Sequence, residues 1–222
     1  MIDSSIIQQV TAIFANLASR YTLSAYISSA HESAAQMAEF LNDFATTSSH
    51  ISVEYHEAAG NTLYFDLLKE GRPTGITFRG IPNGHEFTSL LLAILNADGK
   101  GKNLPDEGIA RRISALQGDI RLQTYISLSC TNCPDVVQTL NIFALLNPNI
   151  SHEMVDGALF QSEVEAKGVQ AVPSLFADGE LLHVGRGSLG ELLEKLEAKY
   201  PSTSDATNAT GEPTLRSYAV VV

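Results

Sequence analysis

The sequence predicts an α/β protein built from two tandem copies of one fold, each a mixed sheet with helices on both faces, followed by a linker. Two observations support this prediction. Tyr26 and its neighbours match those of Tyr125, and Ile51 and its neighbours match those of Ile150, both at a spacing of 99 residues. Each half of the chain also shows the same order of helical and strand-like periodicity.

The predicted elements of the two halves follow one another in the same order. In the first half they are a helix at 6–17, a strand at 22–28, a helix at 34–45, strands at 51–55, 63–67 and 76–78, and a helix at 87–95. In the second half they are a strand at 121–127, a helix at 136–146, strands at 150–155, 174–177 and 181–184, and a helix at 189–200. A β-α-β unit followed by a hairpin, here turning at Asp178-Gly179, and a last helix is the thioredoxin-like layout.

These elements divide the chain of 222 residues into two copies, 1–100 and 101–200. After them, small polar residues bounded by proline predict a linker at 201–213. The apolar run at 218–222 is typical of a buried strand, so 214–222 is expected to begin a further domain.

Composition and charge exclude several classes of function. The net charge of -11 would repel nucleic-acid phosphates and anionic membrane surfaces. An acid, Asp3, stands where a secretory signal needs basic residues, and no apolar run approaches the length of a membrane span. We therefore expect a cytoplasmic protein that binds neither nucleic acid nor membranes.

The two cysteines, Cys130 and Cys133, follow a predicted strand and open a helix. Backbone N–H groups at a helix amino terminus lower the pKa of a neighbouring thiol, and only the thiolate attacks a disulfide. We assign Cys130 as the exposed attacking sulfur and Cys133, one helical turn on, as the buried resolving sulfur. This predicts a redox-active dithiol flanked by Thr131 and Asn132.

The alternative is a structural zinc site, which would need two further ligands. With no other cysteine in the chain, they would have to be histidines, and none shows ligand spacing near a second pair. The histidines are His31, His50, His56, His85, His152 and His183. We therefore expect no metal.

Val172 and Pro173 precede the strand at 174–177. In thioredoxin-like folds the proline at this place is cis and faces the cysteines, and the backbone of the residue before it can pair with an incoming partner. We include both as supporting site residues.

The first copy has lost these parts. The spacing of 99 residues places His31 and Ala34 opposite the two cysteines, and strand matching places Thr62 opposite Pro173. The first copy therefore cannot cycle a disulfide, and two roles stay open: shaping the groove around the dithiol, or structural support.

Two further motifs have competing interpretations. The segment 185–190 fits G-x-G-x-x-G, but it follows a hairpin strand and is followed by the linker, so we reject a dinucleotide site. Glu86 could shuttle a proton to the thiols, or it could only cap or balance a helix terminus.

The tandem fold, the degenerate first copy and the segments 127–138, 84–90 and 171–174 together closely resemble the amino-terminal part of the alkyl hydroperoxide reductase flavoprotein (AhpF). The resemblance covers nearly the whole chain. In this family Glu86 matches a residue near the thiols, whereas Thr131 departs from the usual His, so a less stabilised Cys130 thiolate is expected. The run at 214–222 resembles the start of the family's flavin (FAD) domain.

The resemblance implies a protein-disulfide oxidoreductase that works within an NADH-dependent peroxiredoxin reductase. Electrons would pass from NADH through FAD to the carboxy-terminal reductase domain, then to Cys130–Cys133, and finally to the disulfide of a peroxiredoxin. The chain itself is expected to hold no flavin or nicotinamide. Two alternatives stay open: a free-standing glutaredoxin-like or disulfide-isomerase-like oxidoreductase, and a non-redox adaptor.

Overall fold

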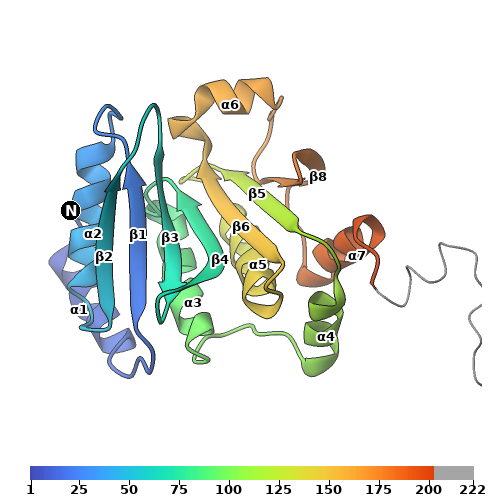
Figure 1. Ribbon diagram of the computed structural model, residues 1–222, viewed down its shortest axis with the longest axis horizontal. Helices are drawn as coiled ribbons and strands as arrows, with labels where there is room; N and C mark the ends of the chain where they lie inside the picture. The colour runs from blue at the N-terminus through green and yellow to red at the C-terminus, as the bar shows by residue number, and fades with distance from the viewer. Residues whose placement is uncertain (203–222) are drawn as a thin grey trace, which may run out of the picture.

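The computed structural model describes residues 1–202, which fold into two similar halves (Figure 1). The first half consists of α1 (Ser4–Ile13), β1 (Tyr21–Ile27), α2 (Ala34–Ala45), β2 (Ile51–Glu57), β3 (Leu63–Lys69), β4 (Arg72–Arg79), η1 (Gly84–Glu86) and α3 (Phe87–Ala97). The second half consists of α4 (Glu107–Ala115), β5 (Ile120–Ile126), α5 (Cys133–Leu146), β6 (Ile150–Asp156), η2 (Gly157–Leu159), α6 (Gln161–Ala166), β7 (Ser174–Ala177), β8 (Glu180–Val184) and α7 (Leu189–Lys199). The predicted strand at 214–222 and nearly all of the predicted linker lie outside the described residues.

The strands of the described part form one mixed, eight-stranded sheet in the order β2-β1-β3-β4-β6-β5-β7-β8. Each half contributes the same local order, because β1 runs parallel to β2 and antiparallel to β3, as β5 does with β6 and β7. The halves join where β4 pairs in parallel with β6. The prediction of two tandem thioredoxin-like units is confirmed, and the sequence did not reveal that they share one sheet.

The strand register confirms the predicted repeat. Tyr21 lies opposite Ile51 in the first half, and Ile120 lies opposite Ile150 in the second, so both parallel pairs are related by 99 residues. The loops carry the same relation, because the N–H of His31 donates to Ser28 O at 3.0 Å and that of Cys130 to Ser127 O at 3.0 Å.

The register also corrects one assignment. Strand matching placed Thr62 opposite Pro173. In the sheet, Ser174 is equivalent to Tyr64, since each lies opposite the matching residue of β5 or β1. Leu63 is therefore the counterpart of Pro173. The connections that precede β3 and β7 differ in length. For this reason the alignment of the two copies from the sequence was wrong by one residue at this point.

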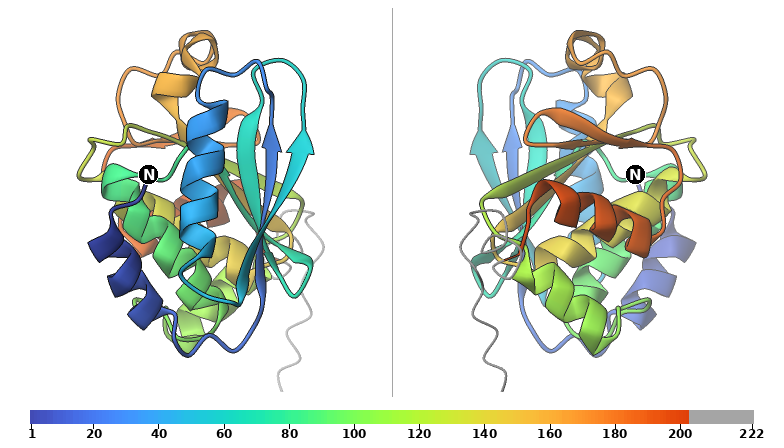
Figure 2. Two further views of the ribbon diagram at one scale, coloured as in Figure 1. Left: turned by 90° about the vertical axis from the view of Figure 1, so that its left-hand side faces the viewer. Right: turned by 90° about the vertical axis from the view of Figure 1, so that its right-hand side faces the viewer.

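The helices are divided unequally between the two faces of the sheet. Figure 2 shows α1, α2, α3 and α5 together on one face. On the opposite face α6 covers the carboxyl ends of the strands, where Glu163 pairs with Arg79 at 2.7 Å and accepts a hydrogen bond from the Tyr125 hydroxyl. Helices therefore contact both faces, as predicted.

Helix α5, which begins at Cys133, is the best-buried helix of the second half. Its residues Val136, Leu140 and Phe143 are fully buried against the sheet and its neighbours. The helix is also tied to the sheet by His152, whose Nδ1 lies 2.7 Å from Asn141 Oδ1 and whose Nε2 lies 2.7 Å from Thr124 Oγ1. Burial of this kind fixes the position of the cysteines at its amino terminus.

This histidine makes stability depend on pH. Burial lowers the pKa of His152 to about 3, from an ordinary value of 6.5. Below pH 6.5 the unfolded chain binds a proton that the folded chain refuses, so the free energy of unfolding should decrease by about 1.4 kcal/mol per pH unit down to about pH 3. Urea unfolding measured across this range should show that extra slope in the natural protein and lose it in His152→Gln. Equal slopes in both proteins would contradict the expectation.

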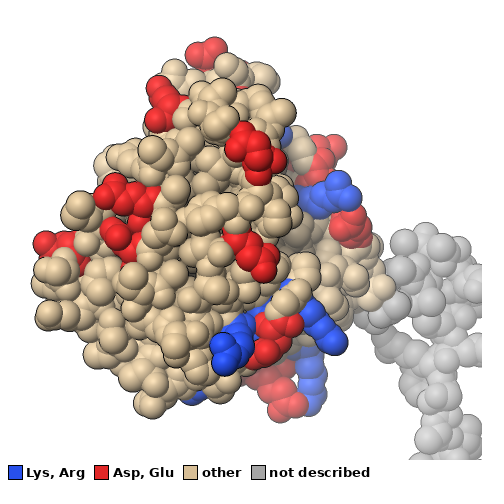
Figure 3. All heavy atoms as spheres, turned by 60° about the vertical axis from the view of Figure 1, so that its left-hand side comes forward, with Lys and Arg blue, Asp and Glu red and all other residues tan. Residues whose placement is uncertain are grey.

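The surface charge agrees with the acidic composition. The face in Figure 3 carries acidic side chains scattered across it, whereas its basic side chains gather mainly toward one end. That face therefore offers no broad basic surface for nucleic-acid phosphates. Within residues 1–202, no helix combines the length and the apolar character needed to cross a membrane.

Candidate dithiol site

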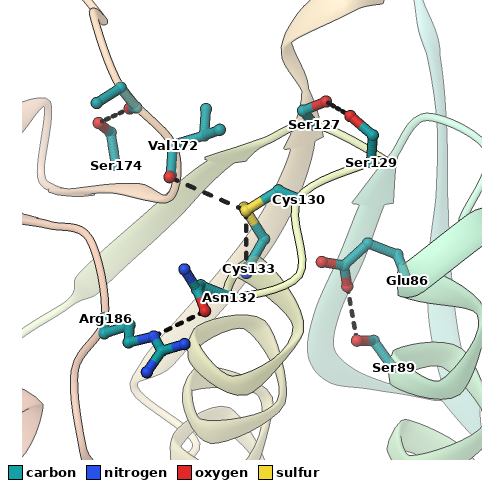
Figure 4. The surroundings of a disulfide bond; sticks show 11 residues. Glu86, Ser89, Ser127, Ser129, Cys130, Asn132, Cys133, Val172, Ser174 and Arg186 are labelled. Atoms are coloured by element: carbon teal, nitrogen blue, oxygen red, sulfur yellow. Dashed lines mark hydrogen bonds between the residues drawn. A yellow bond between two sulfur atoms is a disulfide. The ribbon is translucent and has the colours of Figure 1, made fainter.

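The cysteines lie where the β5–α5 loop meets the amino terminus of α5 (Figure 4). Cys130 and Cys133 form a disulfide with a Cα–Cα distance of 5.5 Å. The N–H of Cys133 donates to Cys130 Sγ at 3.1 Å, so a backbone donor of the helix terminus faces this sulfur. Cys133 is fully buried, whereas Cys130 is partly exposed. Of the two, Cys130 alone is therefore open to a sulfur that arrives from outside.

The two residues between the cysteines have different surroundings. Thr131 is exposed, whereas Asn132 is half-buried and its Oδ1 accepts a hydrogen bond from Arg186 Nε at 2.7 Å. Arg186 comes from the β8–α7 loop and was not singled out in the sequence. The Thr131 side chain is too short to replace the ring of the histidine that is usual at this position in the family. That this difference weakens the stabilisation of the Cys130 thiolate stays a prediction.

Val172 and Pro173 lie beside the disulfide, as expected for this fold. The Val172–Pro173 peptide bond is cis, and the Val172 carbonyl oxygen lies 3.9 Å from Cys130 Sγ. Val172 is 37% exposed, which is unusual for a valine. It forms an apolar rim beside the more exposed sulfur of the disulfide (Figure 4).

Glu86 approaches the dithiol from the first half of the protein. Figure 4 shows its carboxyl group turned toward the side of the cysteines. The side chain is fully buried, Oε2 accepts a hydrogen bond from Ser89 Oγ at 2.6 Å, and Oε1 has no partner among the described residues. Burial raises the pKa of Glu86 to about 7, the hydrogen bond from Ser89 opposes this rise, and the charge of Asp135 adds to it. A carboxyl group that titrates near neutral pH can accept and return a proton.

Two contacts fix Glu86 beside the second half. The N–H of His85 donates to Leu128 O at 3.3 Å, in the loop that carries Cys130. Gln138 of α5 donates to Ser89 Oγ at 3.2 Å, which joins Ser89 and Glu86 to the dithiol helix. Of the two roles left open for the first half, these contacts favour shaping the surroundings of the dithiol.

The position equivalent to Cys130 in the first half is closed. His31 is only 6% exposed, its Nδ1 accepts from the N–H of Ser33 at 3.0 Å, and its ring faces Phe160 with centroids 6.2 Å apart. Ala34 begins α2 as Cys133 begins α5. This site therefore has neither a sulfur nor open access.

Two other candidate motifs were a metal site and the glycine-rich segment. In residues 1–202 no group of three or more His, Cys, Asp or Glu residues could hold a metal ion. The glycine-rich segment 185–190 leads from β8 into α7, where Ser188 Oγ accepts from the N–H of Glu191 at 3.2 Å and caps the helix. It therefore forms the turn into α7.

Comparison with known proteins matched the family model described as "Thioredoxin domain" to residues 120–198. The AhpF protein of Pseudomonas aeruginosa, a subunit of alkyl hydroperoxide reductase, is 37% identical over 197 residues, which cover 89% of this chain and 37% of the relative. A Bacillus subtilis protein named NADH dehydrogenase is 44% identical over 160 residues, 72% of this chain and 31% of the relative. The chain thus spans about a third of the length of these relatives.

Solved structures show the same relation. The amino-terminal domain of the alkyl hydroperoxide reductase AhpF from Enterococcus faecalis superposes with a TM-score of 0.80 and 31% identity, covering 88% of this chain and 100% of the solved chain. A protein disulfide oxidoreductase from Aeropyrum pernix has a TM-score of 0.79 at 20% identity and covers 90% of this chain and 95% of its own. The second match supports the fold alone.

Proposed function

Because the chain belongs to the family of the amino-terminal domain of the alkyl hydroperoxide reductase flavoprotein AhpF, we propose that it carries electrons from a flavoprotein reductase domain to the disulfide of a peroxiredoxin. The observation that carries this proposal is the asymmetry of the dithiol: Cys130 is partly exposed beside Val172, and Cys133 is fully buried. An exposed attacking sulfur and a buried resolving sulfur are what a two-step exchange requires.

In the first step the Cys130 thiolate attacks one sulfur of the partner's disulfide. The partner's S–S bond breaks, a mixed disulfide forms at Cys130, and the other partner sulfur leaves as a thiolate. The N–H of Cys133, which points at Cys130 Sγ, stabilises the attacking thiolate before the reaction.

In the second step the Cys133 thiolate attacks Cys130 Sγ. The mixed disulfide breaks, the Cys130–Cys133 disulfide forms, and the second partner sulfur leaves as a thiolate. Two electrons have then passed to the partner, and the two protons lost by the cysteines balance the two that its thiolates take up. We propose that Glu86 accepts the proton of Cys133, because its carboxyl group is buried beside α5 and has a pKa of about 7.

We propose that FAD and NADH act in a carboxy-terminal part of a longer protein, because the chain spans only about a third of the length of its relatives. The G-x-G-x-x-G segment of this chain supports that placement, because it turns into α7 after a hairpin strand and does not begin a β-α-β unit. We also propose that the boundary between the first copy, which lacks the dithiol, and the second copy, which carries it, lies between residues 100 and 101.

The cytoplasm suits this role, because thiols there are kept reduced and catalytic disulfides are transient. A glutaredoxin-like oxidoreductase is the main competing function. An assay that starts from the reduced protein distinguishes it from the proposed function. The reduced protein is given either an oxidised peroxiredoxin of the same organism or a glutathionylated peptide. It should reduce the peroxiredoxin at least about tenfold faster than the peptide, which corresponds to a barrier lower by about 1.4 kcal/mol.

The variant Cys130→Ser should lose both activities in this assay. If the glutathionylated peptide were reduced as fast as the peroxiredoxin, the glutaredoxin-like function would replace our proposal. If Cys130→Ser supported transfer at the natural rate, the site itself would be wrongly assigned.

A further inference from the structure

Ser89 and Gln138 connect the buried carboxyl group of Glu86 to helix α5. Ser89 is fully buried, and its Oγ lies 2.6 Å from Glu86 Oε2 and 3.2 Å from Gln138 Nε2. The other carboxyl oxygen, Oε1, is buried and has no partner among residues 1–202. In Figure 4 this second oxygen is the one directed toward the side of the cysteines. The two oxygens of Glu86 therefore have different surroundings.

The Ser89 hydroxyl has one hydrogen, and Gln138 decides where that hydrogen points. The amide NH₂ group of Gln138 only donates, so Ser89 Oγ accepts from it and directs its own hydrogen to Glu86 Oε2. If the amide were reversed, the carbonyl oxygen of Gln138 and Glu86 Oε2 would compete for this single hydrogen, and one acceptor would lose its partner. The observed arrangement satisfies all three groups.

This direction determines which oxygen of Glu86 takes up a proton. A proton on Oε2 would have to donate to Ser89 Oγ, which already accepts from Gln138. The hydrogen of Ser89 would then lose its acceptor in a fully buried site, which is costly. A proton on Oε1 leaves both hydrogen bonds intact. Oε1, on the side of the dithiol, is therefore the oxygen that is open to a proton.

We propose that Gln138 is a positioning residue, which holds the Ser89 hydroxyl toward Glu86 Oε2 and so keeps the proton of Glu86 on Oε1. The inference deepens the proposed function, on which it rests, by naming the residue that orients the proton acceptor. In the resolving step the proton passes from Cys133 Sγ to Oε1, and the electron pair of the S–H bond stays on sulfur as the thiolate. Asp135 of α5, whose charge raises the pKa of Glu86, stays in place in every variant below.

Infrared spectroscopy of the oxidised protein tests this inference without a partner protein. Subtracting the spectrum of Glu86→Gln isolates the carbonyl band of protonated Glu86, and the loss of this band with rising pH gives the pKa. Gln138→Met keeps the length of the side chain and removes the donor. It should raise the pKa of Glu86 by about 0.5 unit, the size expected if the hydrogen bond from Ser89 to the carboxylate weakens by up to about 30%. The band should also move to higher frequency, because a proton on Oε2 leaves Oε1 as a carbonyl oxygen without a hydrogen bond.

Ser89→Ala separates an effect through the hydroxyl from a direct effect of Gln138. In this background Gln138→Met should change the pKa of Glu86 by less than about 0.2 unit and should not move the band. Gln138→Lys keeps a donor at this position, so its band should stay at the natural frequency. The matched control is Thr139→Val, which removes a polar group from the next half-buried residue of α5 and should change neither the pKa nor the band.

Three outcomes would overturn the inference. A lower pKa in Gln138→Met would mean that Gln138 accepts from Ser89, an unchanged pKa and band would remove any role for Gln138, and equal changes in the Ser89→Ala background would show that Gln138 does not act through Ser89. If Gln138→Met does not fold, Gln138→Glu, whose carboxylate only accepts, should move the band in the same direction, and an unmoved band would overturn the inference. Because no partner is present, a failure of peroxiredoxin reduction leaves these results unaffected.

Discussion

Replacing Cys133 with serine is expected to stop the reaction at the mixed disulfide between Cys130 and the partner protein. Serine is nearly the same size, so the buried position should be preserved, but its hydroxyl cannot break an S–S bond under these conditions. Turnover should fall by at least about a hundredfold, because the resolving step is lost. Non-reducing electrophoresis and mass spectrometry should show a covalent adduct joined through Cys130.

The matched variant is Cys130→Ser, which should form no adduct. Its remaining sulfur, Cys133, is fully buried and has no access to a partner. Adducts of equal yield in the two variants would contradict the assignment of separate attacking and resolving roles. An adduct joined through Cys133 would reverse those roles.

Replacing Glu86 with glutamine is expected to slow the resolving step by about a hundredfold, the low end of the range for general base catalysis. In the natural protein this step should accelerate with pH through the Glu86 pKa of about 7, because only the ionised carboxylate accepts a proton. The variant should lose that dependence. Single-turnover rates of partner release, measured by stopped flow across this pH range, test both expectations.

The same substitution should stabilise the protein above neutral pH. The pKa of Glu86 is raised from 4.5 to about 7 on folding, so its contribution to stability is lost as the pH rises from 4.5 through 7. At pH values well above 7 the glutamine variant should have a free energy of unfolding about 3 kcal/mol higher. Ser89→Ala removes the hydrogen bond that lowers the pKa of Glu86. In this variant the resolving step should therefore accelerate at a higher pH than in the natural protein. An unchanged pH profile in both variants would exclude Glu86 from the proton transfer.

Much of the architecture follows from sequence periodicity because its two halves repeat. The spacing of 99 residues that relates Tyr26 to Tyr125 also relates the strand registers, since parallel β-α-β units of equal length keep the same offset. The pairing of β4 with β6 could not be predicted in this way, because the sequence carries no signal for which edge strand meets which.

Helices α4 and α6 were missed for different reasons. Helix α4 has a readable start, because Asp106 accepts from the N–H of Ile109, but its single buried residue, Ile113, leaves a weak apolar pattern. Helix α6 has six residues and none of them is buried, so no periodicity marks it.

For the candidate site, the sequence was informative about residues adjacent to the motif and uninformative about those brought in by folding. Cys130 and Cys133 follow from their place between strand and helix. Arg186 lies 54 residues from Asn132, in a segment that sequence reasoning assigned only to a turn. Ser89 and Gln138, which hold Glu86, come from two helices in different halves, and only the packing of α3 against α5 brings them together.

The central claim is that oxidation of the Cys130–Cys133 dithiol supplies the electrons that reduce the partner. The most direct test mixes the reduced protein with an oxidised peroxiredoxin, quenches the reaction with acid at successive times, and counts both disulfides by alkylation and mass spectrometry. We predict that one Cys130–Cys133 disulfide forms for each partner disulfide lost, with matching time courses. Reduction of the partner while Cys130 and Cys133 remain dithiols would contradict the account.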